Sequence, residues 1–245
     1  MRATPGLLGL AIGLLGASAS RAEPRVERLK VPGFRDAALI APRLPGKRPV
    51  VVGLHGNFDR PEWFCGEGLA PITNGKAWLL CPRGVPRGDA PRAWDRWTWP
   101  ARSRVRAEID AALAALRRER GERIAEAPPL LAGFSLGAIL AARLAVERPE
   151  RAPFLYLVEG SHQVWDARAI ARFTGSGGRA ILFGCGGRGC AAITGRICAS
   201  VTRGSKTTCA TVTATGLGHG YGSPLTALSA PRFHELLGPA LAPPR

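Results

Sequence analysis

A serine flanked by glycines is the residue of this chain best placed for nucleophilic chemistry. The segment Gly133–Gly137 reads GFSLG, and it follows an apolar run and precedes a helical pattern. Glycines at these two positions tolerate a strained turn and let a strand and a helix approach closely, so that a serine hydroxyl stands out above a sheet. We therefore predict that Ser135 is a nucleophile. The alternative for the same residue is that Ser135 only caps the helix.

A histidine in a glycine-rich segment is the expected general base. The segment Leu217–Gly222 reads LGHGYG and follows the last apolar run of the strand type. A base must reach the serine from a loop, and glycines supply the backbone freedom that such a loop needs. The chain has four histidines, which are His55, His162, His219 and His234. Position and elimination favour His219.

An oxyanion hole is expected after the first central apolar run. Residues Leu54–Asn57 read LHGN, and a His-Gly turn at this place can aim the next backbone N–H at the oxygen of an acyl group. We expect the N–H groups of Asn57 and Leu136 to be the two donors, with Phe58 as the alternative to Asn57. His55 is expected to hold the loop in place rather than to move protons.

Short apolar runs alternate with helical patterns from residue 48 onward, and they must position these side chains. The runs cover residues 49–54, 77–80, 130–134, 154–158, 180–183 and 209–213. Continuous apolarity is typical of strands buried on both faces of a parallel sheet. The clearest helix is expected from Ser103, as its N-cap, to Gly121. The alternation predicts an α/β fold with a doubly wound, mostly parallel sheet, and residues 26–31 and 37–40 add an antiparallel edge.

The order of these motifs resembles the α/β-hydrolase superfamily. The oxyanion loop at His55–Asn57, the turn at Gly133–Gly137 and the final His219 follow one another as in that superfamily, over nearly all of residues 48–238. The compact length, without a large cap domain, resembles secreted phospholipase/carboxylesterase-like and polyhydroxyalkanoate depolymerase-like serine esterases. The resemblance implies a sheet of the α/β-hydrolase type and hydrolysis of small-molecule or polymeric esters through an acyl-enzyme.

The acid of a Ser-His-acid site is missing from its usual place. The resemblance implies a carboxylate in the loop after Leu182–Gly184, but that loop reads CGGRGC. Glu159 is the best candidate, because it follows the preceding apolar run at the edge of the sheet where the site is expected. Asp166 is the reserve, although it also has the position of a helix N-cap. A serine-histidine dyad without an acid is the third alternative.

Aromatic residues in loops at the same edge are candidates for substrate binding. Trp97, Trp165 and Phe58 follow expected strands or site residues, where their rings would wall an acyl or aromatic pocket. The alternative is that they pack loops over the sheet. No cofactor or metal is expected, since the cysteines lack the spacing of a zinc site.

The first 22 residues have the composition of a secretory signal peptide. Arg2 is a positive start, Gly6–Ala17 is apolar and uncharged, and Ser20 and Ala22 are small residues before a cleavage site. An uncleaved anchor is the alternative. Residues 23–245 are expected to form a single domain and a monomer that is periplasmic or secreted. An oxidising compartment predicts disulfides for the six cysteines, and of fifteen connectivities we favour Cys65–Cys81, Cys185–Cys190 and Cys198–Cys209.

The chain is strongly basic but is not patterned for nucleic acid. Its 245 residues include 34 Lys and Arg against 18 Asp and Glu, a formal net charge of +16. Most of the cations are scattered arginines, whereas a surface for nucleic acid requires clustering on one face. We expect no nucleic-acid partner, and at most a loose, salt-sensitive association with an anionic cell-envelope surface. A non-catalytic, basic cell-envelope binding protein on a hydrolase scaffold is the rival function.

Overall fold

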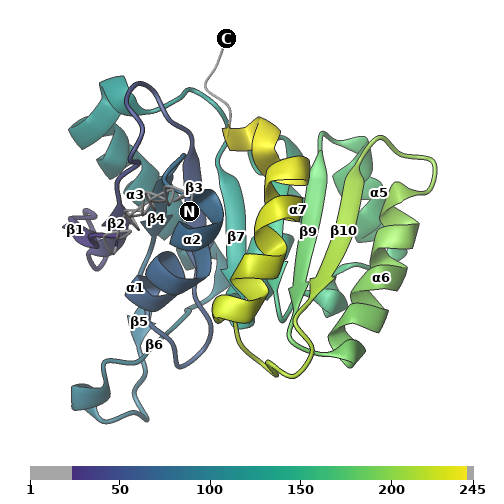
Figure 1. The fold of residues 1–245 in the computed structure, drawn as a ribbon. Coiled ribbons are helices and arrows are strands. Elements are labelled where there is room, and N and C mark those ends of the chain that lie inside the picture. The colour runs from purple at the N-terminus through teal and green to yellow at the C-terminus, as the bar shows by residue number, and fades with distance from the viewer. Residues whose placement is uncertain (1–23, 242–245) are drawn as a thin grey trace, which may run out of the picture.

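A mostly parallel sheet of eight strands forms the centre of the molecule (Figure 1). The computed structural model describes residues 24–241, so the expected signal peptide at residues 1–22 lies outside the described residues. The strand order is β1-β2-β4-β3-β7-β8-β9-β10. The strands of this sheet are β1 (Glu27–Leu29), β2 (Ala37–Ile40), β3 (Val50–Leu54), β4 (Trp78–Cys81), β7 (Leu130–Phe134), β8 (Phe154–Val158), β9 (Ala180–Cys185) and β10 (Thr208–Thr213).

Strand β1 pairs antiparallel with β2, and β2 pairs antiparallel with β4, whereas the other neighbours in the sheet, from β4 and β3 through β7, β8, β9 and β10, are parallel. The doubly wound sheet and its antiparallel edge are thus confirmed. A short hairpin of β5 (Val85–Pro86) and β6 (Trp97–Thr98) lies outside the sheet and was not expected. Its strands have two residues each, which is too short for a periodic signal.

Helices cover both faces of the sheet (Figure 1). The helices are α1 (Pro61–Trp63), η1 (Phe64–Leu69), α2 (Ala70–Thr73), α3 (Arg102–Arg120), α4 (Leu136–Glu147), α5 (Ala167–Gly175), α6 (Arg188–Thr202) and α7 (Ser223–Leu241), with short 3₁₀ turns η2 (Arg92–Trp94), η3 (Gly121–Arg123), η4 (Pro149–Arg151) and η5 (His162–Val164). Apolar residues of η1, α2 and α7 pack on one face, and those of α3, α4 and α6 pack on the other. Successive residues of β3 alternate between these two cores, which is why the strand is apolar throughout.

The start of α3 differs from the expected one. The helix begins at Arg102 with Ala101 as its N-cap residue, and no side chain caps it. Ser103 therefore lies inside the first turn and is exposed. In the described part of the chain, no helix is both long enough and apolar enough to cross a membrane.

The three disulfides pair as favoured from the sequence. Cys65–Cys81 joins η1 to β4, Cys185–Cys190 joins the end of β9 to the first turn of α6, and Cys198–Cys209 joins α6 to the start of β10. No cysteine between residues 24 and 241 is left free. Each pair links segments that are close in the chain, with sequence separations of 16, 5 and 11. The disulfides therefore cross-link elements that lie near each other in the sequence, and none of the three joins segments that are far apart in the sequence.

The winding of the sheet reverses at β3, which lies between β4 and β7. Crevices at such a reversal, beyond the carboxyl ends of the strands, are the usual ligand sites of open α/β sheets. Leu54 at the end of β3 pairs with Gly133 near the end of β7, and Phe134 pairs with Val158 at the end of β8. The loops that follow β3, β7 and β8 therefore emerge side by side at one edge.

Candidate active site

Ser135 occupies a sharp turn between β7 and α4. Its backbone has φ 52° and ψ −116°, a conformation that a residue with a side chain rarely adopts. A Cβ at Gly137 would lie 1.9 Å from the carbonyl oxygen of Leu54, and one at Gly133 would lie 2.4 Å from that of Gly137. Only glycine fits at these two positions. The Ser135 side chain makes no capping hydrogen bond to α4, so the capping alternative does not describe this turn.

Ser135, His219 and Glu159 form a chain of contacts at the carboxyl edge of the sheet. Ser135 Oγ lies 2.8 Å from His219 Nε2, and His219 Nδ1 lies 3.3 Å from Glu159 Oε2. The His219 side chain is 60% exposed, whereas that of Glu159 is only 12% exposed. The structure thus brings together the three side chains that the sequence singled out, with the histidine open to solvent and the carboxylate below it.

Glu159 is the first residue after β8, and its backbone is left-handed, with φ 49°. Its N–H donates to the carbonyl oxygen of Gly184 at 2.9 Å, so the residue prolongs the β8–β9 ladder by one step. The carboxylate then turns back toward His219 and also accepts a hydrogen bond from the N–H of Gly186. The reserve candidate, Asp166, instead caps α5 by accepting from the N–H of Ala169 at 2.7 Å.

The two expected oxyanion donors come from different elements, since Leu136 follows Ser135 and Asn57 lies in the loop after β3. Leu136 is the first residue of α4, where a helix leaves its N–H groups without intrahelical partners. The Asn57 side chain is held by Arg87 and Thr98, whose donors each lie 2.7 Å from Asn57 Oδ1. The N–H of Phe58 donates to the carbonyl oxygen of Trp97 at 3.0 Å. That bond leaves Phe58 unavailable as the alternative donor.

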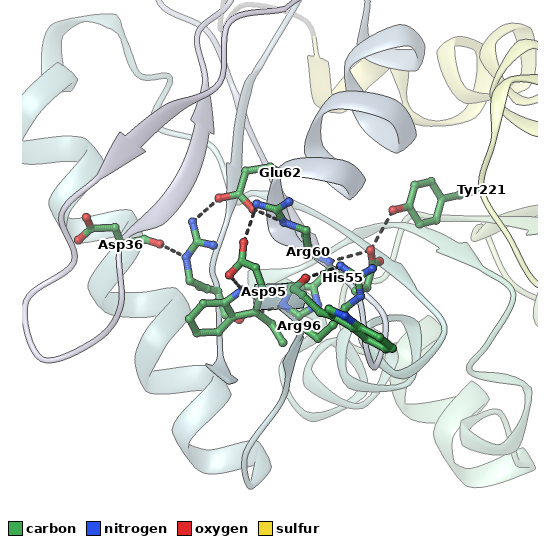
Figure 2. A network of polar contacts seen from close by, with 11 residues as sticks. Asp36, His55, Arg60, Glu62, Asp95, Arg96 and Tyr221 are labelled. Atoms are coloured by element: carbon green, nitrogen blue, oxygen red, sulfur yellow. Dashed lines mark hydrogen bonds and ion pairs between the residues drawn. The ribbon is translucent and has the colours of Figure 1, made fainter. Parts of the chain in front are cut away.

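Asp59 joins the loop after β3 to the loop that carries His219, and no sequence pattern points to it. Its side chain is buried and accepts from the N–H of Gly56 at 3.1 Å, from the N–H of Arg60 at 2.7 Å and from the hydroxyl of Tyr221 at 3.1 Å. Figure 2 shows the Tyr221 hydroxyl pointing toward this contact. Burial and the Asp59 carboxylate together raise the pKa of Tyr221, which therefore stays a hydrogen-bond donor. The Tyr221 ring also packs edge-on against Phe134, next to the serine.

An ion-pair cluster supports the same loop from outside (Figure 2). Arg60 pairs with Asp95 at 2.5 Å, and Arg83 pairs with Glu62. The guanidinium of Arg83 also donates to the carbonyl oxygen of Asp36 at 2.9 Å. These contacts tie the segment after β3 to the β5–β6 hairpin and to the segment before β2.

His55 is buried below the loop and does not face the serine. Its Nδ1 lies 2.8 Å from the carbonyl oxygen of Gly56 and its Nε2 lies 2.9 Å from that of Arg83, while its ring stacks on Trp99 at 4.5 Å. Burial lowers the pKa of His55. The ring is therefore neutral and donates to one of the two carbonyls. This placement agrees with the expected role of His55 in holding the loop.

The three aromatic candidates have different surroundings. Trp165 is only 6% exposed and packs edge-on against Phe173 and Phe183 in the core, which does not support the expected substrate contact. Trp97 is half-buried and its backbone braces the oxyanion loop, because its N–H donates to the carbonyl oxygen of Asp59 at 3.1 Å. Phe58 is 38% exposed and remains a candidate for substrate contact.

Comparisons with known proteins place the fold. No protein-family model and no curated protein sequence matches the chain. The chain is similar to a solved S-formylglutathione hydrolase from Agrobacterium tumefaciens, with 17% identity and a TM-score of 0.55 over 88% of this chain and 93% of that chain. It is similar to an esterase from Rhizomucor miehei, with 13% identity and a TM-score of 0.61 over 89% of this chain and 85% of that chain. It is also similar to a ferulic acid esterase from Anaeromyces mucronatus in complex with ferulic acid, with 14% identity and a TM-score of 0.59 over 91% of this chain and 94% of that chain. At these identities the likeness shows the fold alone, and the predicted α/β-hydrolase fold is confirmed.

Proposed function

We propose that this chain is a secreted serine hydrolase that cleaves carboxylic esters through an acyl-enzyme. The observation that carries the proposal is the 2.8 Å contact between Ser135 Oγ and His219 Nε2, at a strained turn on the carboxyl edge of the sheet. A nucleophile within hydrogen-bond reach of a base that is itself held by a third group is the arrangement required for acyl transfer. The resemblance to esterases of the same fold supports the choice of an ester as substrate.

The proposed reaction uses each of these side chains in turn. His219 Nε2 takes the proton of the Ser135 hydroxyl as the oxygen attacks the ester carbonyl carbon, and Glu159 holds the ring with Nδ1–H toward the carboxylate. The N–H groups of Asn57 and Leu136 stabilise the negative oxygen of the tetrahedral intermediate. His219 then gives its proton to the departing alkoxide, which leaves as the alcohol.

Hydrolysis of the acyl-enzyme repeats these roles with water. His219 takes a proton from the water molecule as its oxygen attacks the acyl carbon, and the same proton is returned to Ser135 Oγ when the acid leaves. Because the His219 side chain is largely exposed, water reaches the base without a gate. An open base is also compatible with both small-molecule and polymeric esters.

The three disulfides support export to an oxidising compartment, as the expected signal peptide does. The rival function, a non-catalytic basic envelope-binding protein, is favoured by the net charge of +16. The two functions differ in one property, since only the hydrolase needs a reactive serine.

The deciding experiment measures hydrolysis of 4-nitrophenyl acetate and labelling by a fluorophosphonate probe for the wild type and for Ser135→Ala. We expect the wild type to be active and labelled, and the variant to lose both while its circular dichroism stays unchanged. Ser176→Ala is the matched control, because Ser176 is exposed at the end of α5, away from the site. Unchanged turnover in Ser135→Ala would refute the mechanism, and an unlabelled, inactive wild type would favour the binding protein.

A further inference from the structure

The loop after β9 contacts Glu159 and the residue before His219, although it contains no carboxylate. Gly186 donates its N–H to Glu159 Oε1, and its carbonyl oxygen accepts the N–H of Gly218 at 3.1 Å. Gly218 directly precedes His219 in the chain. One residue of this loop is therefore hydrogen-bonded through its N–H to the acid and through its carbonyl oxygen to the segment that carries the base.

The Cys185–Cys190 disulfide closes this loop. Cys185 is the last residue of β9 and is fully buried, and Cys190 lies in the first turn of α6. A carboxylate oxygen of Glu159 and the two sulfur atoms lie within 4.8 Å of one another. Because the sulfurs are bonded to each other, they are not thiolate ligands for a metal. The cluster is a disulfide packed against the acid.

The approach of Gly186 to the histidine loop leaves no room for a side chain. A Cβ on Gly186 would lie 1.8 Å from the carbonyl oxygen of Gly218. The end of β9 is fixed in addition by the N–H of Ala214, which donates to the carbonyl oxygen of Cys185 at 2.8 Å. The loop is thus clamped between the end of β9, the start of α6 and the segment after β10.

We propose that the Cys185–Cys190 loop is a positioning element for the reaction, which sets the relative placement of Glu159 and His219 through the two hydrogen bonds of Gly186. The inference rests on the proposed ester hydrolysis. At the place where the resemblance implied an acid, this chain has a disulfide-closed turn that orients an acid supplied by the preceding strand. Without the cross-link, the turn of residues 186–189 is open, and Gly186 is no longer held within hydrogen-bond distance of Glu159 and Gly218.

The loop acts on the rate and not on substrate binding. The two hydrogen bonds of Gly186 go to Glu159 and to Gly218, and the candidate substrate contact Phe58 comes from another loop. A displacement of about 1 Å in a reacting geometry lowers the rate by about a hundredfold. We expect a kcat at least tenfold lower when the loop is opened, with a KM within about twofold of the wild type.

The first test removes the cross-link and compares it with a distant one. The double variant Cys185→Ala/Cys190→Ala is measured beside Cys198→Ala/Cys209→Ala, whose disulfide joins the same helix α6 to the opposite end of the β9–β10 ladder. Steady-state kinetics with 4-nitrophenyl acetate, the rate of fluorophosphonate labelling and the urea midpoint are recorded for both. We expect only the first variant to lose kcat and labelling rate, while both lose stability.

The second test keeps all disulfides and serves if the double variant does not fold. Gly186→Ala pushes the loop away from Gly218, and Gly195→Ala is its control, since a Cβ at Gly195 in α6 has nothing within 4 Å. We expect kcat to fall at least tenfold in Gly186→Ala with KM maintained, and to stay unchanged in Gly195→Ala. The alanine in the helix is expected to raise the urea midpoint slightly.

The outcomes separate this inference from the function on which it rests. An active wild type whose Gly186→Ala variant keeps full kcat overturns the positioning role and leaves the hydrolase proposal standing. An equal fall of kcat after loss of either disulfide also overturns it, because the effect is then one of general stability. A wild type that neither hydrolyses the ester nor reacts with the probe refutes the hydrolase, and the positioning role with it.

Discussion

Replacing Glu159 by glutamine tests the acid of the proposed triad. In the wild type, Glu159 accepts from Gly186 through one oxygen and from His219 Nδ1 through the other. A glutamine that keeps its oxygen on the Gly186 N–H turns its NH₂ group toward His219. Nδ1 must then act as an acceptor, so the ring proton moves to Nε2, which can no longer take the proton of Ser135. If the glutamine amide instead turns its oxygen toward His219, its NH₂ group faces the N–H of Gly186, and that hydrogen bond is lost.

The size of the effect follows from the contact. A histidine locked in the wrong tautomer by a buried acid-to-amide change loses about 10⁴ in kcat. Here the His219–Glu159 contact is 3.3 Å long and the His219 side chain is 60% exposed. Water can therefore accept the Nδ1–H in the variant, and a fraction of the molecules keeps the tautomer that reacts. We therefore expect kcat to fall by about 10² to 10³, which corresponds to about 3 to 4 kcal/mol of activation free energy. KM should change little.

The assay is steady-state hydrolysis of 4-nitrophenyl acetate at fixed pH, with the urea midpoint as a check on folding. Asp166→Asn is the matched control, because asparagine caps a helix as well as aspartate does and should keep both the α5 cap and kcat. A kcat of Glu159→Gln within about threefold of the wild type would show that the dyad alone sustains the reaction. A larger loss in Asp166→Asn than in Glu159→Gln would reassign the acid.

Two other predictions concern the supports of the site. Tyr221→Phe removes the 3.1 Å hydrogen bond to Asp59 but keeps the ring against Phe134. We expect the free energy of unfolding to fall by about 1 to 2 kcal/mol and kcat to fall several-fold. Unchanged values of both would show that the two loops do not depend on this bond. Burial lowers the pKa of His55, so below about pH 6.5 the unfolded chain binds a proton more readily than the folded chain does, while the charges of Asp59 and Arg83 shift this pKa in opposite directions. The free energy of unfolding should therefore fall by up to about 1.4 kcal/mol per pH unit as the pH drops below that value. Urea unfolding at pH values from 7.5 to 5 measures how the free energy of unfolding changes with pH. We expect a weaker pH dependence in His55→Gln than in the wild type. An equal pH dependence in both would assign the acid sensitivity to other groups.

The parts of the site that the sequence predicted are those with a local signal. Ser135 stands in a five-residue pattern whose glycines are required by contacts within a few ångströms, and the continuous apolar runs mark strands with two buried faces. His219 was found because a loop histidine with glycine neighbours is rare in this chain.

The parts that escaped prediction depend on distant contacts. Asp59 meets Tyr221 across 162 positions of sequence, and no local pattern distinguishes a buried loop aspartate from an exposed one. Trp165 has the sequence context of a loop residue at the active edge, yet the aromatic rings of α5 and β9 bury it. The role of Gly186 was likewise hidden, because a glycine's hydrogen bonds come from its backbone and leave no mark in the residue type.

The ladder that extends past the strand ends has a consequence for heat inactivation. The N–H of Ser135 donates to the carbonyl oxygen of Val158, and the N–H of Glu159 donates to that of Gly184, each at 2.9 Å. The nucleophile and the acid are thereby joined to the central sheet, whereas His219 stands on the loop between β10 and α7. On gentle warming we therefore expect the base to be misplaced before the other two, and activity to return on cooling, because Ser135 and Glu159 remain bonded to the sheet.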